Sequence, residues 1–149
     1  MKQVVIGASI ISFILATGFD TEDGAAIRQG VHIEWYRTVS PGNSGEAIFV
    51  WSDTRYGMRN IFAHKINQDG ELLWGESGAI VTDLPGRQED PVSITDGNGG
   101  VFVAWVDYRF DEQGDIFFQH LDNNGDILLD SNGVALAQVE GKQITINMC

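Results

Sequence analysis

Two short segments of the chain combine an acid and a base with an indole ring. They are Trp51-Ser52-Asp53-Thr54-Arg55 and Trp105-Val106-Asp107-Tyr108-Arg109. Alternate residues of a strand share a face, so each Asp–Arg pair would lie side by side, and such a pair can recognise a polar ligand. Because both segments carry the pair, however, it is more economically explained as holding the loop beside each tryptophan. We therefore assign no catalytic residue and predict a structural role for Trp51, Asp53, Arg55, Trp105, Asp107 and Arg109.

Oxygen-rich turns are the strongest candidates for a metal site. Asp122-Asn123-Asn124-Gly125-Asp126 and Asn67-Gln68-Asp69-Gly70-Glu71 place acid and amide oxygens at the close spacing of calcium loops. The full calcium-loop pattern with its distal bidentate glutamate is missing, and hairpin turns need Asn, Asp and Gly in any case. The histidines, His32, His64 and His120, show no ligand spacing. We therefore predict no metal site and no cofactor.

Neighbouring acids offer a second kind of chemistry. Glu89-Asp90 and Asp111-Glu112 fall in predicted loops, where two carboxylates could flank a glycosidic bond. The chain has 21 acidic residues, so such pairs arise readily by composition alone. They keep a glycoside hydrolase open as an alternative without identifying a catalytic pair.

The elements that position these residues recur along the chain. The two tryptophan segments are offset by 54 in the numbering (105 − 51), and Gly70 and Gly125 are offset by 55 (125 − 70). Subtracting 54 from 88 puts Glu34 at the position of Gln88. Apolar runs at 47–51 and 101–105 follow glycine-rich turns, and further short runs begin at 61, 72 and 79 and again at 116, 127 and 134. A period of about 50 residues with four strands per period predicts an all-β, propeller-like array.

The repeated residues resemble a motif of exported bacterial β-propeller repeat proteins: Trp-x-Asp-x-Arg, then Asp-Ile-Tyr-Ala-Gln, Gly-x-x-Leu-Trp and Gly-x-Gln-x-x-Pro. Matching stretches are Asn60-Ile61-Phe62-Ala63-His64, Asp115-Ile116-Phe117-Phe118-Gln119 and Gly86-Arg87-Gln88. The resemblance implies propeller blades, loosely similar to sialidase-type repeats, in surface or secreted proteins. The Ser-x-Asp-x-Gly-x-Thr-Trp box of sialidases is absent from the sequence, and the resemblance therefore transfers no catalytic residue.

These patterns divide the chain into an exported leader, a linker and repeats. Met1-Lys2 followed by an apolar run to Leu15 has the layout of a secretory signal that is too short to span a bilayer. The alternative is that this run is a buried first strand. We predict a signal peptide at 1–18, a linker at 19–30, and β-propeller-like repeats at 31–149, with unit 1 at 31–84, unit 2 at 85–139 and the start of unit 3 at 140–149. About two four-stranded blades plus the first strand of a third make an incomplete propeller.

Charge and cysteine content narrow the possible partners. The formal net charge is −12, and loss of Lys2 with the leader leaves eight basic against 21 acidic residues, or −13. Such acidity argues against nucleic acid and anionic membranes as partners. The single cysteine, Cys149, allows no intrachain disulfide. We expect no membrane span in the mature chain, a secreted or cell-surface location, and further repeat units of the same protein as partners, with a glycan or protein ligand in addition.

The function predicted from these features is that of a non-catalytic binding or structural propeller segment of a larger secreted or cell-surface bacterial protein. The alternative is a fragment of a secreted carbohydrate-active enzyme, a sialidase-like glycoside hydrolase. An enzyme should gather acids and arginines that differ from unit to unit, whereas the polar loop residues here mostly repeat.

Overall fold

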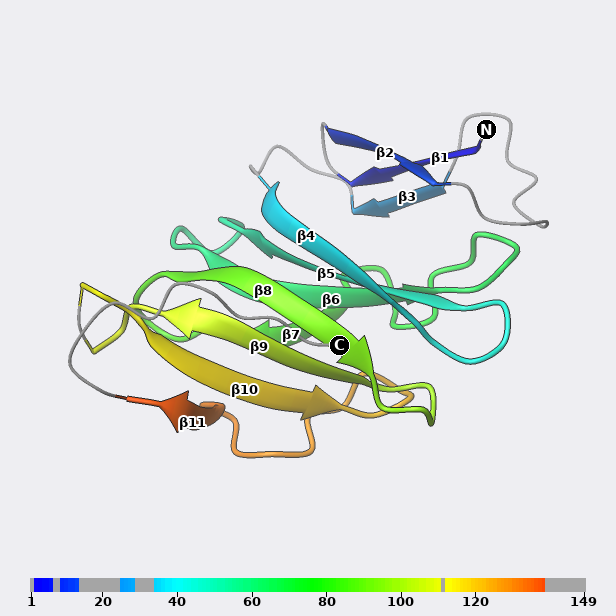
Figure 1. Ribbon diagram of the computed structural model, residues 1–149. Helices are drawn as coiled ribbons and strands as arrows, with labels where there is room; N and C mark the ends of the chain where they lie inside the picture. Colours follow the sequence, from blue (N-terminus) through cyan, green and yellow to red (C-terminus); the bar gives the residue numbers. More distant parts are fainter. Residues whose placement is uncertain (1, 7–8, 14–24, 29–33, 111, 139–149) are drawn as a thin grey trace.

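The computed structural model describes residues 2–6, 9–13, 25–28, 34–110 and 112–138, and within these ranges all regular structure is β (Figure 1). None of these residues belongs to a helix that could serve as a membrane span. The expected all-β class is confirmed. The strands are β1 Lys2–Ile6, β2 Ser9–Phe13, β3 Ala25–Arg28, β4 Glu34–Pro41, β5 Ala47–Asp53, β6 Asn60–Ile66, β7 Ala79–Thr82, β8 Gln88–Thr95, β9 Val101–Asp107, β10 Asp115–Leu121 and β11 Val134–Ala137.

Two four-stranded antiparallel sheets make up most of the described chain. The first sheet has the order β4-β5-β6-β7 and the second has the order β8-β9-β10-β11, so each is a meander of consecutive strands. Neither sheet closes on itself. A smaller sheet, β2-β1-β3, lies in the range assigned to the leader and linker, and β3 falls inside the predicted linker. Cleavage after residue 18 stays a prediction, and the start of unit 3 at 140–149 lies outside the described residues.

The second sheet reproduces the strand register of the first. Glu34 pairs with Asp53, and Gln88 pairs with Asp107, so both partners are displaced by the same offset of 54 (88 − 34 and 107 − 53). The ladder is interrupted at the same place in each sheet, between Trp35 and Thr38 and between Glu89 and Val92. The expected correspondence of Glu34 with Gln88 therefore holds in the pairing of the strands.

The oxygen-rich turns are side-chain-stabilised hairpin turns. Asp122 Oδ1 accepts hydrogen bonds from the backbone N–H groups of Asn124 and Asp126, at 2.7 and 3.0 Å. Asn67 Oδ1 accepts in the same way from the N–H groups two and four residues later. These turn residues thus bond their own backbone, as Asn and Asp commonly do in turns. The apolar runs beginning at 72 and 127 form single bridges to Ile66 and Leu121, not strands.

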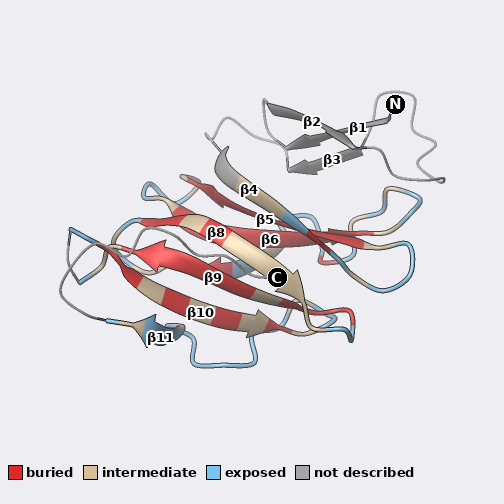
Figure 2. Ribbon diagram, in the orientation of Figure 1, coloured by how far each residue is buried: buried red, intermediate tan, exposed pale blue. Residues whose placement is uncertain are grey.

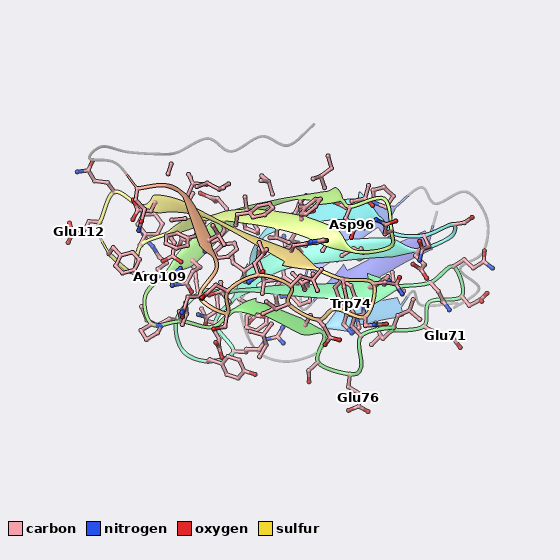
Figure 3. All side chains as sticks on the ribbon, turned by 90° about the horizontal axis from the view of Figure 1, so that it is seen from below. Glu71, Trp74, Glu76, Asp96, Arg109 and Glu112 are labelled. Carbon is pink, nitrogen blue, oxygen red and sulfur yellow. The ribbon has the colours of Figure 1, made fainter. Side chains whose placement is uncertain are left out.

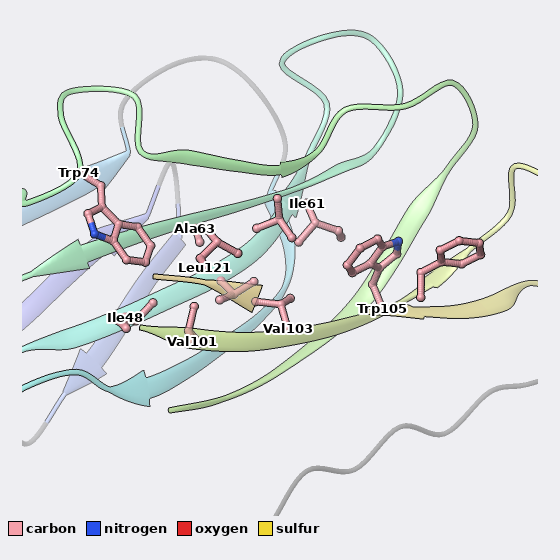
Figure 4. Packing of buried hydrophobic residues seen from close by; sticks show 11 residues of the cluster. Ile48, Ile61, Ala63, Trp74, Val101, Val103, Trp105 and Leu121 are labelled. Atoms are coloured by element: carbon pink, nitrogen blue, oxygen red, sulfur yellow. The ribbon is translucent and has the colours of Figure 1, made fainter. Parts of the chain in front are cut away.

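The core lies between the two sheets (Figure 4). Ile48, Val50, Ile61 and Ala63 of the first sheet are fully buried against the second sheet, where Trp105 and other β9 and β10 side chains meet them. Every residue of β5 and β6 is buried, which explains why the apolar runs of these strands do not alternate with exposed polar residues (Figure 2). In β10, by contrast, buried and half-buried residues alternate, so only one of its faces is covered.

Candidate functional site

In the first sheet, Trp51, Asp53 and Arg55 form a closed hydrogen-bonded cluster at the end of β5. The indole Nε1 donates to Asp53 Oδ2 at 2.9 Å, and Arg55 donates to the same carboxylate through Nε at 2.9 to 3.0 Å and through Nη2 at 2.6 Å. Arg55 Nη1 also donates to the Ser77 carbonyl. The side chains of Asp53 and Arg55 are 0% and 7% exposed. The cluster therefore leaves little of its polar surface to a ligand.

The second sheet builds the same cluster from Trp105, Asp107 and Arg109 with one difference. Trp105 Nε1 donates to Asp107 Oδ2 at 3.0 Å, and the guanidinium Nη2 lies 3.0 Å from that oxygen and donates to the Asn132 carbonyl at 2.7 Å. The Arg109 side chain is 10% exposed. Its Nε is buried and has no hydrogen-bond partner, whereas the Nε of Arg55 bonds Asp53.

Both guanidinium groups also lie over aromatic rings. The Arg55 guanidinium carbon is 3.7 Å from the ring centre of Phe62, and that of Arg109 is 4.1 Å from the ring centre of Phe117. Phe62 and Phe117 stand beside Trp51 and Trp105, with ring centres 6.3 Å apart in each pair. Each arginine thus joins the loop after the tryptophan strand to the neighbouring strand, by charge, hydrogen bonding and cation–π contact together.

A buried polar chain connects the first sheet to the cluster of the second. Asn60 Nδ2 donates to Gln88 Oε1 at 2.9 Å, and Gln88 Nε2 lies 3.5 Å from Asp107 Oδ1. Asn60, Gln88 and Asp107 are at most 2% exposed. The Gln88 backbone N–H donates to the Arg59 carbonyl, so β8 is tied to the loop before β6 as well. Asp107 therefore receives bonds from its own loop and from a chain of amides that begins in the other sheet.

Charged residues at the start of β8 form a second link. Arg59 pairs with Glu89, and Arg87 Nε lies 3.4 Å from the same carboxylate, whose side chain is 7% exposed. Asp90 adopts a left-handed backbone with φ of 50°. Burial raises the pKa of the Asp90 carboxyl above its ordinary range, and the adjacent Glu89 carboxylate raises it further.

The acid pairs do not assemble a catalytic centre among the described residues. Glu89 and Asp90 lie in β8, so their assignment to a loop is wrong; the pairing of β8 with β9 places them at the strand interruption. Asp111 lies outside the described residues, and Glu112 is exposed at the end of the sheets where Arg109 lies (Figure 3). The Glu89 carboxylate contacts two arginines, Arg59 and Arg87, within the fold.

At the other end of the sheets, Lys65 and Trp74 hold the turns of the second sheet. The Lys65 side chain is 1% exposed, and Nζ donates to the Gly99 carbonyl at 2.9 Å and to Asn123 Oδ1 at 2.7 Å. Trp74 Nε1 donates to the Asn123 carbonyl at 3.0 Å. An ammonium group therefore lies against one of the turns that resembled a calcium loop. Figure 3 places Trp74 and Asp96 at this end and Arg109 at the other.

His64 and His120 lie in strands and bind protein groups. His64 is buried, with Nε2 2.7 Å from the Gly75 carbonyl, and burial lowers the pKa of its imidazole below the ordinary value. His120 Nε2 lies 2.9 Å from Asp96 Oδ2. His32 lies outside the described residues. Among the residues that the structure describes, no three His, Cys, Asp or Glu side chains are grouped as metal ligands.

An open cleft of about 580 Å³ adjoins the second cluster. It lies between the β7–β8 connection, the loop after β9 and the loop before β11. Its walls are formed by Leu84, Pro85, Arg109, Phe110, Phe117, Asn132, Gly133, Ala135 and Gln138. Arg109 and Phe110 belong to this wall; Phe110 is 64% exposed, whereas the Arg109 Nε atom is buried from solvent.

Sequence reasoning found the two clusters but missed the residues that join the sheets. Lys65 and Asn60 flank the apolar run of β6 and are almost fully buried; a polar residue beside an apolar run is the sequence signal that could have marked them. Asn123 was considered only as a metal ligand. Comparison of the chain with protein-family models, with curated proteins and with solved structures finds no match. The site must therefore be understood from its own geometry.

Proposed function

We propose that the chain is a non-catalytic binding or structural module, a β-propeller-like segment of a larger secreted or cell-surface bacterial protein. Each sheet acts as one blade-like unit, and the recurring Trp, Asp and Arg residues are architectural: they fix the loop after the second strand of each unit. The partners are further units of the same protein, with a glycan or protein ligand bound elsewhere on the assembled array.

The observation that carries this proposal is that both aspartate carboxylates of the motif are buried and are bonded inside the fold. The Asp53 and Asp107 carboxylates are both 0% exposed and each accepts bonds from an indole and an arginine. A residue that binds substrate needs an accessible polar group, whereas these groups are turned inward. Their recurrence in two sheets with one register favours a role in joining units over a role in recognising a ligand.

Hydrolysis assays distinguish the module from the enzyme fragment. The full chain is incubated with fluorogenic glycosides, including sialosides, and we expect no turnover above the buffer rate. In parallel, Arg109→Ala is compared with Glu112→Ala, a matched change of an exposed charge on the same connection. We expect Arg109→Ala to lower the free energy of unfolding and Glu112→Ala to leave it nearly unchanged.

Turnover that disappears in Glu89→Gln or Asp90→Asn, with the folded state retained, would replace the module with the glycoside hydrolase alternative. An unchanged stability of Arg109→Ala would separately remove the architectural role of the motif.

A further inference from the structure

The second sheet has one covered face and one open face. The open face carries apolar side chains from all four strands, as the cross-strand pairs Ile94–Phe102, Val92–Ala104, Ala104–Phe118 and Phe118–Val134 show. Val134 and Leu136 are 41% and 59% exposed. The Phe102 and Phe118 rings stack with their centres 5.6 Å apart. The open face is defined as Val92, Ile94, Phe102, Ala104, Ile116, Phe118, Val134 and Leu136.

The corresponding face of the first sheet is covered. An offset of 54 in β9 and of 55 in β10 and β11 places Phe102, Phe118 and Leu136 at Ile48, Ala63 and Val81, all of which are 0% exposed. The contrast is sharpest between Leu136, which is 59% exposed, and Val81. At these three positions the first sheet is buried and the second is more exposed, although both sheets have the same register; Ala104, at the Val50 position, is 0% exposed like Val50.

The second sheet itself is what covers the first. Val101, Val103, Trp105, Phe117 and Leu121 form the covering face and pack on the buried aliphatic residues of β5 and β6. The strand β8 lies against β4, β5 and β6. The interface between the first and second sheets thus shows how one sheet of this register packs on another.

We infer that the open face of the second sheet is the seat of a third sheet of the same strand register, which packs on it as the second sheet packs on the first. This inference rests on the proposed function and identifies the surface through which the partner unit binds. The partner presents a tryptophan-bearing strand with aliphatic residues at the positions of Val101, Val103 and Leu121.

A second copy of the chain added head to tail is a poorer occupant. It would have to present the far face of its first sheet, because that face carries the tryptophan of the first unit. In the full chain, which includes the predicted leader, Phe49, Trp51 and Phe62 on that face are at most 1% exposed. These side chains would have to be uncovered before this face of a second copy could pack on the open face.

The second sheet lacks the polar contacts that Lys65 and Trp74 of the first sheet make across the first interface. The residue at the position of Lys65 is His120, which bonds Asp96 within its own sheet and does not reach across. The residue at the position of Trp74 is Leu129, which is 37% exposed. The third sheet therefore does not need the two oxygen acceptors that Gly99 and Asn123 offer to Lys65 in the first interface. Apolar contacts hold this second interface together.

The test adds a second copy of the second sheet to the chain and asks whether this copy covers the open face. A second copy of residues 85–139 is inserted after residue 139, in a Cys149→Ser background, and Leu136→Cys is introduced in the original unit. The rate of maleimide labelling is compared with that of the unlengthened Leu136→Cys chain, at dilutions where both sediment as monomers. We expect labelling to slow by about tenfold or more, because a covered thiol reacts only after local opening. Ser131→Cys, on an exposed turn, should react at the same rate in both chains.

Two variants make the result specific. Val103→Asp in the inserted copy alone should restore fast labelling. The second variant gives the original unit the face of the first sheet, with the reporter cysteine at the Val81 position. Its substitutions are Phe102→Ile, Ala104→Val, Phe118→Ala, His120→Lys, Leu129→Trp and Leu136→Cys. Protection in this chain without protection on the native face would overturn the inference, and so would fast labelling in both.

The unlengthened Leu136→Cys chain reports on the alternative occupant. If it stays dimeric on dilution while its introduced thiol is protected, a second copy of the chain occupies the open face. None of these outcomes bears on glycoside hydrolysis, so the proposed function is tested independently.

Discussion

At the scale of single residues, the two clusters differ at the Nε atom of the arginine. Arg55 and Arg109 occupy equivalent loops, but Arg55 Nε bonds Asp53 while Arg109 Nε has no partner. A buried donor without a partner costs about 1–3 kcal/mol. The second cluster therefore relies more heavily on its Nη2 contacts with Asp107 and Asn132 and on the Phe117 ring.

Removal of the acid from the second cluster should be costly. Asp107→Ala leaves the Arg109 guanidinium and the Trp105 indole without their acceptor, and breaking a buried ion pair on one side costs about 3–5 kcal/mol. Asp107→Asn keeps an acceptor and should cost less. Urea titrations of both variants measure the difference; equal losses would show that the charge of Asp107, not its geometry, sets the stability.

Truncation of the buried indole should have a comparable effect. Trp105 is 0% exposed and belongs to the core between the sheets, so Trp105→Ala should lower the free energy of unfolding by about 3–5 kcal/mol. Met58→Ala, at a side chain that is 53% exposed, serves as the control and should stay within about 0.5 kcal/mol. Similar denaturation midpoints for the two variants would contradict the burial of Trp105.

His64 should make stability depend on pH between neutral and weakly acidic conditions. Burial lowers the pKa of His64 in the folded state, so the unfolded state binds more protons below the ordinary value of 6.5. Its contribution is fully present above pH 6.5 and is lost as the pH falls toward the folded pKa. The slope should disappear in His64→Gln, measured as the urea midpoint from pH 8 to pH 5. The lowered pKa values of Asp96 and Asp122 act at a lower pH than this window.

At the scale of the elements, turn glycines bring strands and rings close together. Gly133 has φ of +74°, and a Cβ there would lie 2.7 Å from Trp105 Cη2. Its neighbourhood contrasts with that of Gly97, which has φ of +78° and nothing within 4 Å of a Cβ. The two glycines share a backbone conformation, so a comparison isolates the steric demand of the indole ring.

Alanine at these two positions should therefore have unequal effects. Gly97→Ala carries the cost of the left-handed backbone alone, about 1–2 kcal/mol. Gly133→Ala adds a clash with Trp105 and should be more destabilising. Thermal melts of both variants report the difference, and near-UV circular dichroism should change only for Gly133→Ala. Equal melting temperatures would mean that the ring moves aside without cost.

The strands could be predicted from sequence because their signals are local. Apolar runs bounded by glycine turns predict β5 and β9, and the sequence offset of 54 alone places Glu34 at the Gln88 position, which the strand pairing confirms. The links between sheets could not be predicted, since they join residues far apart in the chain, such as Asn60 with Gln88 and Lys65 with Asn123. Nothing in a single strand indicates that a buried lysine will reach the next sheet.

At the scale of the whole molecule, acidity opposes the attraction of the open face. The formal net charge of −12 keeps copies apart at low salt, while Val134, Leu136 and the stacked Phe102 and Phe118 rings favour contact. At physiological ionic strength, salt screens the repulsion between charges that are more than about 8 Å apart, but it does not weaken apolar contact. Solution behaviour should therefore depend on salt.

We expect weak self-association that increases with ionic strength. Sedimentation velocity should show mostly monomer in dilute low-salt buffer and larger species as sodium chloride or protein concentration rises. Leu136→Glu places a charge on the open face and should reduce association, whereas Glu112→Gln, away from it, should not. If association falls as the salt concentration rises, attraction between charged groups, and not the open face, causes the association.

The matching registers of the two sheets have a consequence for how the chain reaches its fold. β4 and β8 pair with β5 and β9 through ladders that coincide after a shift of 54 residues (88 − 34), so each strand could take the place of the other during refolding. A strand misplaced by one unit, or donated by another molecule, would satisfy the same backbone bonds and become a kinetic trap. Gln88 distinguishes the two outcomes, because only β8 carries the amide that bonds both Asn60 and Asp107. Refolding yield should therefore depend on protein concentration more steeply in Gln88→Ala than in the parent chain.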